Sequence, residues 1–375
     1  MRIFLQAIFG QIFLNAYIFR RGYQALPPKK AVRVPFILFF AIELLLYFTG
    51  YFFHKDLPDP ILHRIMMICS TWYIASIYIT MGLIVLDLVR LSNRIRPWYP
   101  ETLKKHWNTV KLSLFPVFIF FVAGLMIQGY HNAIYPAVRH VYIQIPKAME
   151  GRDSLTIAMM SDLHIGESIG KKNVQRFVEL CNAEHPDIVL IAGDMMDYES
   201  RHAEREHIEE DMQRLNAPLG VYMILGNHEY RANRFAKLRW LEKTGGILLV
   251  DSVAMPDSAF YLIGRDDVTN GKRASLETLM QEMDLTKPVI VLDHQPYAQE
   301  AVDNGCDLAL YGHTHNGQYW PFSLLLRFVF EFPYGYFSKG NTHIYVSSGI
   351  GFAGPPYRIG TRSELVVLHV GFQTN

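Results

Sequence analysis

Five groups of polar side chains in the second half of the chain each follow a short apolar run. In chain order they are Asp162 and His164, Asp194, Asn227 and His228, His294, and His313 and His315. Ligands gather beyond the carboxyl ends of strands in α/β sheets, so this recurrence predicts that the groups meet at one edge of a fold. Carboxylate, amide and imidazole donors without a thiolate suit manganese, iron or zinc, whereas calcium or magnesium would normally use fewer histidines.

The number of candidate ligands exceeds what a single ion needs. An aspartate has two oxygens and can bridge two ions about 3.5–4 Å apart, the spacing of two-metal phosphatases. Glycines flank the groups and permit tight turns with close backbone approach, at Gly193, Gly226, Gly312 and Gly317. We therefore expect two divalent metal ions, with manganese favoured over iron or zinc.

The apolar runs before these groups predict buried strands. They are short and lack polar alternation, as in strands covered on both faces, and they span 155–160, 188–192, 221–225, 260–263, 289–292, 308–311 and 344–347. Polar stretches with helical spacing of apolar residues lie between them, at 171–183, 204–215 and 234–244. The pattern predicts an α/β domain over residues 153–375, in which two sheets are packed between helices.

The groups resemble, in order, the five sequence blocks of the calcineurin-like metallophosphoesterases. The blocks are Asp162-Leu163-His164, Gly193-Asp194-Met195-Met196-Asp197, Gly226-Asn227-His228-Glu229, His294 and Gly312-His313-Thr314-His315. Each block alone is common, and their order carries the resemblance, which covers about residues 153–370. The last block continues as in the membrane-associated bacterial branch, except that Asn316 stands where that branch has glycine. The resemblance implies a four-layer α/β/β/α sandwich and a metal-dependent phosphoesterase.

The resemblance also implies a division of the ligands between two ions and hydrolysis by a hydroxide that bridges them. One ion would be held by Asp162, His164 and His315. The other would be held by Asn227, His294 and His313. Asp194 would bridge the two.

Further residues receive roles from the same blocks. His228 resembles the residue that donates a proton to the leaving oxygen, and Glu229 is expected to orient it. Asp197 shares that role, supports a ligand, or is an acidic residue at a helix N-terminus. Asn227 is also a candidate substrate contact, and Arg358 is either a phosphate clamp or a surface residue.

The first part of the chain carries the long apolar stretches. They lie at 3–19, 34–53, 65–88 and 112–130, and the last three reach the roughly 20 residues that cross a bilayer. The first carries Gln11 and Asn15, so a signal segment or an interfacial helix is an alternative for it. A soluble bundle would need a polar stripe on each helix, which 34–53 and 65–88 lack. We expect a transmembrane helical domain of about four helices over residues 1–131, and a connector over 132–152.

Loop charges predict an orientation in the cell membrane. The loops 20–33 and 89–111 are rich in lysine and arginine, whereas the loop 54–64 has balanced charge. Positive loops stay cytoplasmic. With four crossings, the C-terminal domain of this multi-pass protein would lie on the periplasmic or extracytoplasmic side.

The segment 319–337 is apolar and directly follows the last ligand group. It is either a flap that enters the membrane surface or grips an acyl chain, or a covered helix. Both interpretations place the site near the bilayer and favour a lipid-linked phosphoester as the substrate of a phosphodiesterase or pyrophosphatase. A UDP-diacylglucosamine-type pyrophosphate hydrolase of lipid A synthesis and a non-catalytic scaffold that binds metal or phospholipid are the alternatives.

Bulk composition adds two exclusions. A net charge of +1 gives no basic face for nucleic acid, so no nucleic-acid partner is expected. The cysteines Cys69, Cys181 and Cys306 form no spaced framework, so neither a disulfide scaffold nor a thiolate zinc site is indicated.

Overall fold

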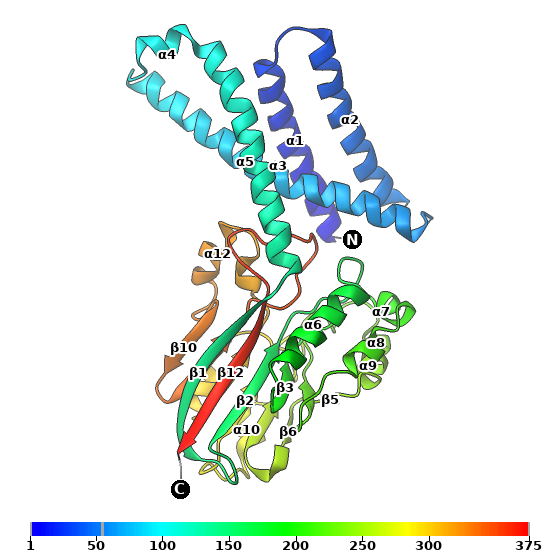
Figure 1. Cartoon of the computed structure of the whole chain (residues 1–375), viewed down its shortest axis with the longest axis vertical. Coiled ribbons are helices and arrows are strands. Elements are labelled where there is room, and N and C mark those ends of the chain that lie inside the picture. Colours follow the sequence, from blue (N-terminus) through cyan, green and yellow to red (C-terminus); the bar gives the residue numbers. More distant parts are fainter. Residues whose placement is uncertain (1, 54–55, 374–375) are drawn as a thin grey trace. The chain divides into compact units, whose positions relative to one another are not determined.

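The computed structural model describes residues 2–53 and 56–373 (Figure 1). These residues form two compact units that divide between Gln128 and Gly129. Each unit is described by itself.

The first unit is helical, with α1 (Arg2–Ala25), α2 (Lys30–Phe52), α3 (Asp59–Ile95), α4 (Glu101–Lys105) and most of α5 (Trp107–Ile134). Among the described residues, three helical segments are long and apolar enough to cross a membrane, at Lys30–Phe52, Pro60–Ile95 and Leu112–Ile134. They correspond to the second, third and fourth predicted stretches. The first stretch is also helical, but α1 is not among these candidate spans.

The polar side chains of α1 contact the neighbouring helices. Gln11 Nε2 and Asn15 Nδ2 donate hydrogen bonds to the two carboxylate oxygens of Glu43 on α2, at 2.9 and 2.6 Å. Asn15 Oδ1 accepts a hydrogen bond of 2.8 Å from Trp72 Nε1 on α3. Gln11, Asn15 and Glu43 are all buried. The residues that lower the hydropathy of α1 are therefore used in helix contacts.

The second unit contains two six-stranded sheets. The first sheet has the order β1-β12-β2-β3-β4-β5, formed by Ala137–Ala148, Glu364–Gln373, Ser154–Met160, Ile188–Ile191, Val221–Met223 and Ile247–Leu248. The second has the order β10-β11-β9-β8-β7-β6, formed by Gly335–Lys339, Thr342–Val346, Leu308–Tyr311, Val289–Leu292, Tyr261–Gly264 and Ser252–Ala254. Strands β2 to β5 run parallel, as do β7, β8, β9 and β11, so their carboxyl ends share an edge in each sheet.

Side-chain alternation along the strands builds three apolar layers. On β2, Leu155 and Ile157 point into the core between the sheets, where they join Leu308 and Leu310 of β9. The opposite face of the first sheet is covered by α6 (Lys171–Ala183), and α9 (Arg234–Glu242) contributes to the same core. The outer face of the second sheet is covered by α10 (Leu276–Met280) and α11 (Gln299–Asp303). The four-layer α/β/β/α architecture is confirmed.

All seven predicted strands are present, to within about two residues at each end. The predicted helix 204–215 is instead two short helices, α7 (Arg201–Arg205) and α8 (Ile208–Met212). They are separated at His207, whose backbone is left-handed with φ 51° and cannot continue a helix.

Three further strands, β1, β12 and β5, complete the first sheet. β1 lies within the segment that the sequence assigned to a connector, and it pairs in parallel with β12 from Ala137 onward. It is an edge strand in which only Ile143 and Ile145 are fully buried, so it lacks the continuous apolar run that marks a central strand.

Candidate metal centre

The seven predicted ligands come together at the carboxyl ends of five strands. Asp162 and His164 follow β2, Asp194 follows β3 and Asn227 follows β4 in the first sheet. His294 follows β8, and His313 and His315 follow β9 in the second sheet. The sandwich therefore places donors from both sheets in one site.

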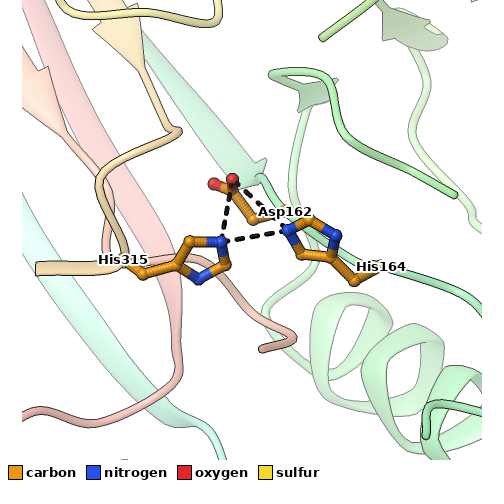
Figure 2. A group of neighbouring side chains, drawn as sticks. All are labelled: Asp162, His164 and His315. Atoms are coloured by element: carbon orange, nitrogen blue, oxygen red, sulfur yellow. Dashed lines mark hydrogen bonds and ion pairs between the residues drawn. The ribbon is translucent and has the colours of Figure 1, made fainter. Parts of the chain in front are cut away.

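One group of donors consists of Asp162, His164 and His315, all buried (Figure 2). The Nε2 atoms of His164 and His315 lie 3.0 Å apart, and His315 Nε2 lies 3.4 Å from Asp162 Oδ1. Donors around one ion with bonds of about 2.0–2.2 Å are separated by about 3.0–3.5 Å. Two imidazole nitrogens and a carboxylate that converge at this spacing fit a divalent cation.

A second group consists of Asp194, Asn227, His294 and His313. His294 Nε2 lies 3.2 Å from both Asp194 Oδ2 and Asn227 Oδ1. His313 Nδ1 lies 2.9 Å from Asn227 Oδ1 and 3.3 Å from His294 Nε2. These separations also fit the donors of one ion.

Asp194 lies between the two groups. Its Oδ2 atom is 3.2 Å from His294 Nε2 in one group and 3.8 Å from His164 Nε2 in the other. Its Oδ1 atom accepts a hydrogen bond of 2.7 Å from the backbone N–H of His228, which fixes the carboxylate. Asp194 Oδ2 therefore faces imidazoles of both groups.

Backbone strain is concentrated at the candidate ligands. Asp162, His164, Asp194, His313 and His315 have φ of 54°, 50°, 52°, 72° and 50°. The left-handed region costs a non-glycine residue about 1–3 kcal/mol and persists only where the surroundings impose it. Hydrogen bonds between the loops impose it here: Asp162 N–H donates to Gly193 O, and His164 N–H donates to Asp194 O. Strain at five of the seven positions indicates a functional site.

The buried carboxylates and imidazoles of the site shift each other's pKa values. Burial, and then the neighbouring His294, lower the pKa of His313 to about 4, so its imidazole is neutral at pH 7. Burial also lowers the pKa of His315 well below its usual value. Burial opposes ionisation of Asp194, but His294 and His164 outweigh it and hold the pKa of that carboxyl well below its usual range. Burial opposes protonation of His294 and His164, but Asp194 outweighs it at His294, and Asp197 and Asp194 outweigh it at His164, so the pKa of both imidazoles is raised. A metal ion binds ionised carboxylates and neutral imidazoles, so its binding here would release protons from these two rings.

His228 lies beside the two groups without belonging to the predicted ligand set. Its Nδ1 atom is 2.8 Å from the carbonyl oxygen of Asp197 and 3.1 Å from Asp197 Oδ1. The same Asp197 oxygen lies 3.6 Å from His164 Nδ1. Asp197 precedes α7 by several residues, so it faces these two imidazoles instead of a helix N-terminus.

The hydrogen bonds that the structure gives Glu229 go to backbone groups, and its expected role in orienting His228 stays a prediction. The Glu229 carboxylate is fully buried and accepts hydrogen bonds from the backbone N–H groups of Asp194, Met196 and Gly226, at 3.0, 3.0 and 2.8 Å. The turn that begins at Gly226 folds Glu229 back against its own loop and the loop after β3. Glu229 therefore fixes the backbone that carries Asp194 and Asn227.

Arg358 is not a surface residue, and its guanidinium contacts protein groups. It is fully buried, and its guanidinium donates to the carbonyl oxygens of His315, Ser348 and Gly351 at 3.1, 2.5 and 2.8 Å. Its Nη2 atom also lies 3.0 Å from His315 Nδ1. These contacts with the carbonyl oxygen and the Nδ1 atom fix the position of the candidate ligand His315.

Sequence reasoning missed the polar run after β7. Asp266 accepts a hydrogen bond of 2.5 Å from the Tyr230 hydroxyl, and Asp267 accepts one of 3.1 Å from Gln295 Nε2, next to the ligand His294. Both carboxylates are buried. The run Arg265-Asp266-Asp267 follows a predicted strand, as the ligand groups do, and that signal would have identified it.

The chain is similar in sequence to a protein family and to several known proteins. A protein-family model described as calcineurin-like phosphoesterase matches residues 155–317. A Danio rerio protein named transmembrane protein with metallophosphoesterase domain is 28% identical over 380 aligned positions, which cover 96% of this chain and 85% of that protein. An uncharacterized metallophosphoesterase of Helicobacter pylori (strain J99) is 27% identical and covers 95% of each chain. Among solved structures, the 5'-nucleotidase precursor of Thermus thermophilus has a TM-score of 0.37 and 15% identity, over 58% of this chain and 55% of that chain.

Proposed function

The C-terminal domain of this chain is a calcineurin-like phosphoesterase domain, and from that premise we propose a membrane-anchored hydrolase of phosphoester bonds that uses two divalent metal ions. The observation that carries the proposal is the convergence of two donor groups, with Asp194 Oδ2 3.2 Å from His294 Nε2 of one and 3.8 Å from His164 Nε2 of the other. Asp162, His164 and His315 would hold one ion, and Asn227, His294 and His313 the other. We propose manganese for both positions, with iron or zinc as alternatives that the same donors accept.

Two cations in these positions would supply an acidified water and neutralise charge on the phosphoryl oxygens. The chain itself supplies proton transfer. Asp197 holds Nδ1 of His228, which leaves Nε2 as the atom that can give a proton to the leaving oxygen. In the structure that Nε2 atom accepts a hydrogen bond of 2.5 Å from Arg231 Nη1, so it can carry a proton only when this contact opens. With Arg358 buried, Arg231 is the better placed guanidinium for a phosphoryl oxygen.

We propose a lipid-linked phosphodiester or pyrophosphate as the substrate. The candidate membrane spans and the exposed apolar side chains that follow His315 support it. A non-catalytic scaffold would not need His228 and Asp197 beside a complete donor set, and this argues for catalysis. UDP-diacylglucosamine-type substrates are a narrower version of the same class.

We also propose four membrane crossings, with α1 as the first. Its polar residues Gln11 and Asn15 pair with Glu43, so they need not face lipid. The basic loops 20–33 and 89–111 would then lie in the cytoplasm, and the catalytic domain outside. Protease treatment of sealed right-side-out vesicles should digest residues 150–375, and full protection would contradict this orientation.

The activity can be tested with the purified full chain. After loading with manganese, we expect hydrolysis of bis-p-nitrophenyl phosphate that is abolished by a chelator and restored by the metal. p-Nitrophenyl phosphate, a monoester with the same leaving group, measures the preference for diesters. A chain that binds metal but hydrolyses neither reporter would support the scaffold instead.

A further inference from the structure

Within the second unit, exposed apolar side chains are concentrated on the ten residues 320–329. This segment includes α12 (Phe322–Leu325), which is labelled in Figure 1, and η3 (Leu326–Phe328). The exposed members of this 320–329 surface are Trp320, Phe322, Leu324, Leu325, Phe328 and Val329. Phe328 is 86% exposed and Val329 is 68% exposed. Single exposed apolar residues are ordinary, but a contiguous cluster of this kind marks an interaction site.

Hydrogen bonds connect this surface to the point where the chain leaves its last candidate span. That span ends at Ile134, and its residues from Gly129 onward belong to the C-terminal domain. Arg358 N–H donates to Gly129 O at 2.8 Å. The next residue, Ile359, accepts at its carbonyl a hydrogen bond of 2.7 Å from Trp320 N–H. One short segment therefore joins the end of the span to the start of the 320–329 surface.

The same surface is attached to the metal centre at both ends. It begins just after η2 (His315–Gly317), which contains a candidate ligand. At its other end, the ring centroid of Phe330 lies 6.1 Å from that of His313, another candidate ligand. Thr314 Oγ1 donates a hydrogen bond of 2.7 Å to Pro333 O and fixes the return of the chain. A molecule bound on the surface would be next to the donors.

We propose that the 320–329 surface inserts into the bilayer interface and presents the phosphoester of a membrane lipid to the metal centre. Full burial of a Leu or Phe side chain contributes about 1.5–3 kcal/mol, so partial insertion of several such residues is favourable. The exposed Arg327 among them suits a phosphate headgroup. The inference deepens the proposed function, because it rests on a hydrolase with a lipid-linked substrate and identifies the surface that binds it.

Insertion can be measured without relying on catalysis. Leu325 and Leu285 are a matched pair, 54% and 51% exposed. Leu285 lies before the amino end of β8, and His294 follows the carboxyl end of the same strand. Leu285 is therefore at the edge of the sheet opposite the donors. The full chain carrying Leu325→Cys or Leu285→Cys is labelled with an environment-sensitive fluorophore in vesicles of phosphatidylcholine and phosphatidylglycerol that contain spin-labelled lipid. The native cysteines are buried and should label slowly.

We expect the lipid quencher to reduce the fluorescence of the label at position 325 and to leave that at position 285 unchanged. Equal quenching at both positions, or none at either, overturns the proposal. A label at position 325 that is shielded from water but not quenched by lipid shows that protein covers the surface, and this also overturns it.

A second experiment tests substrate delivery with reporters of the same chemistry. Leu325→Asp should lower hydrolysis of hexadecyl p-nitrophenyl phosphate in these vesicles by about 10-fold or more, the loss of one inserted side chain. Hydrolysis of soluble bis-p-nitrophenyl phosphate should be unchanged, and Leu285→Asp should affect neither rate. Equal loss on both reporters overturns the delivery role. If the wild-type chain hydrolyses neither reporter, the proposed function fails, while the quenching result still decides membrane insertion.

Discussion

Replacement of Glu229 by glutamine tests whether this buried carboxylate fixes the loops that carry the metal ligands. Its Oε2 atom accepts from the N–H groups of Asp194 and Gly226, and its Oε1 atom accepts from Met196 N–H. A glutamine retains one acceptor oxygen and places an amide NH₂ where the other stood. In its better orientation, the amide nitrogen faces Met196 N–H, so one hydrogen bond is lost, and the Met196 N–H and the amide NH₂ are buried donors that face each other.

The magnitude follows from that single lost contact. An unsatisfied buried donor costs about 1–3 kcal/mol, and hydrogen bonds to charged groups contribute about 1.5–3 kcal/mol. Burial and the nearby Asp194 raise the pKa of Glu229, and the neutral amide removes that repulsion, which offsets part of the loss. We expect Glu229→Gln to lower the free energy of unfolding by about 2 kcal/mol, or roughly 4–8 °C in Tm for a domain of this size. Displacement of Asp194 and Asn227 should weaken metal affinity by about 10–100-fold.

Thermal unfolding of the full chain in detergent, followed by tryptophan fluorescence with chelator present, measures the stability term. Titration of the metal-free chain with manganese measures affinity. Glu179→Gln, on the exposed face of α6, is the control and should change neither value. Unchanged Tm and metal affinity in Glu229→Gln, with a change only in the pH profile of hydrolysis, would refute this reasoning and favour a role in orienting His228.

Three further predictions concern other residues. His228→Ala should keep its metal content and lose about 10²–10⁴-fold in turnover, and near-normal hydrolysis would rule out its proton-transfer role. Arg358→Lys should weaken metal binding about 10–100-fold in manganese titrations, because one ammonium cannot replace the contacts around His315; a rise in KM alone would restore the phosphate-clamp interpretation. Burial opposes ionisation of Glu300, but Leu276 N–H and Arg265 outweigh it and lower the pKa of that carboxyl. The ionised carboxylate therefore stabilises the fold fully above the usual glutamate pKa. This stabilisation is lost as the pH falls through the lowered pKa. Glu300→Gln should therefore reduce the difference in urea midpoint between pH 7 and pH 3, and an unchanged difference would contradict this.

The central strands and the donors could be predicted from the sequence because both depend on local rules. Buried parallel strands such as β8 and β9 are continuous apolar runs, and functional residues follow their carboxyl ends. The sequence predicts a connector at the edge strand β1 because five of its twelve residues are exposed and only two are buried. Its pairing with β12 joins segments more than 200 residues apart, and no local pattern records that contact.

The contacts of Glu229 and Arg358 could not be predicted, because they depend on how loops fold back after the strands end. Glu229 directly follows His228 in sequence, yet its side chain bonds to backbone groups of two loops. Arg358 lies in a glycine-rich stretch that is typical of an exposed loop, but that stretch wraps around the ligand His315. Adjacency in sequence indicates which loop carries a residue and leaves the direction of its side chain open.

Metal content of the purified full chain, measured by inductively coupled plasma mass spectrometry after manganese loading and desalting, tests the central claim most directly. Two groups of donors that share Asp194 predict two ions per wild-type chain, and less than one in Asp194→Ala, which removes the shared carboxylate. A wild-type chain that retains no metal, or an Asp194→Ala chain that retains as much as wild type, would contradict a dinuclear centre at these strand ends.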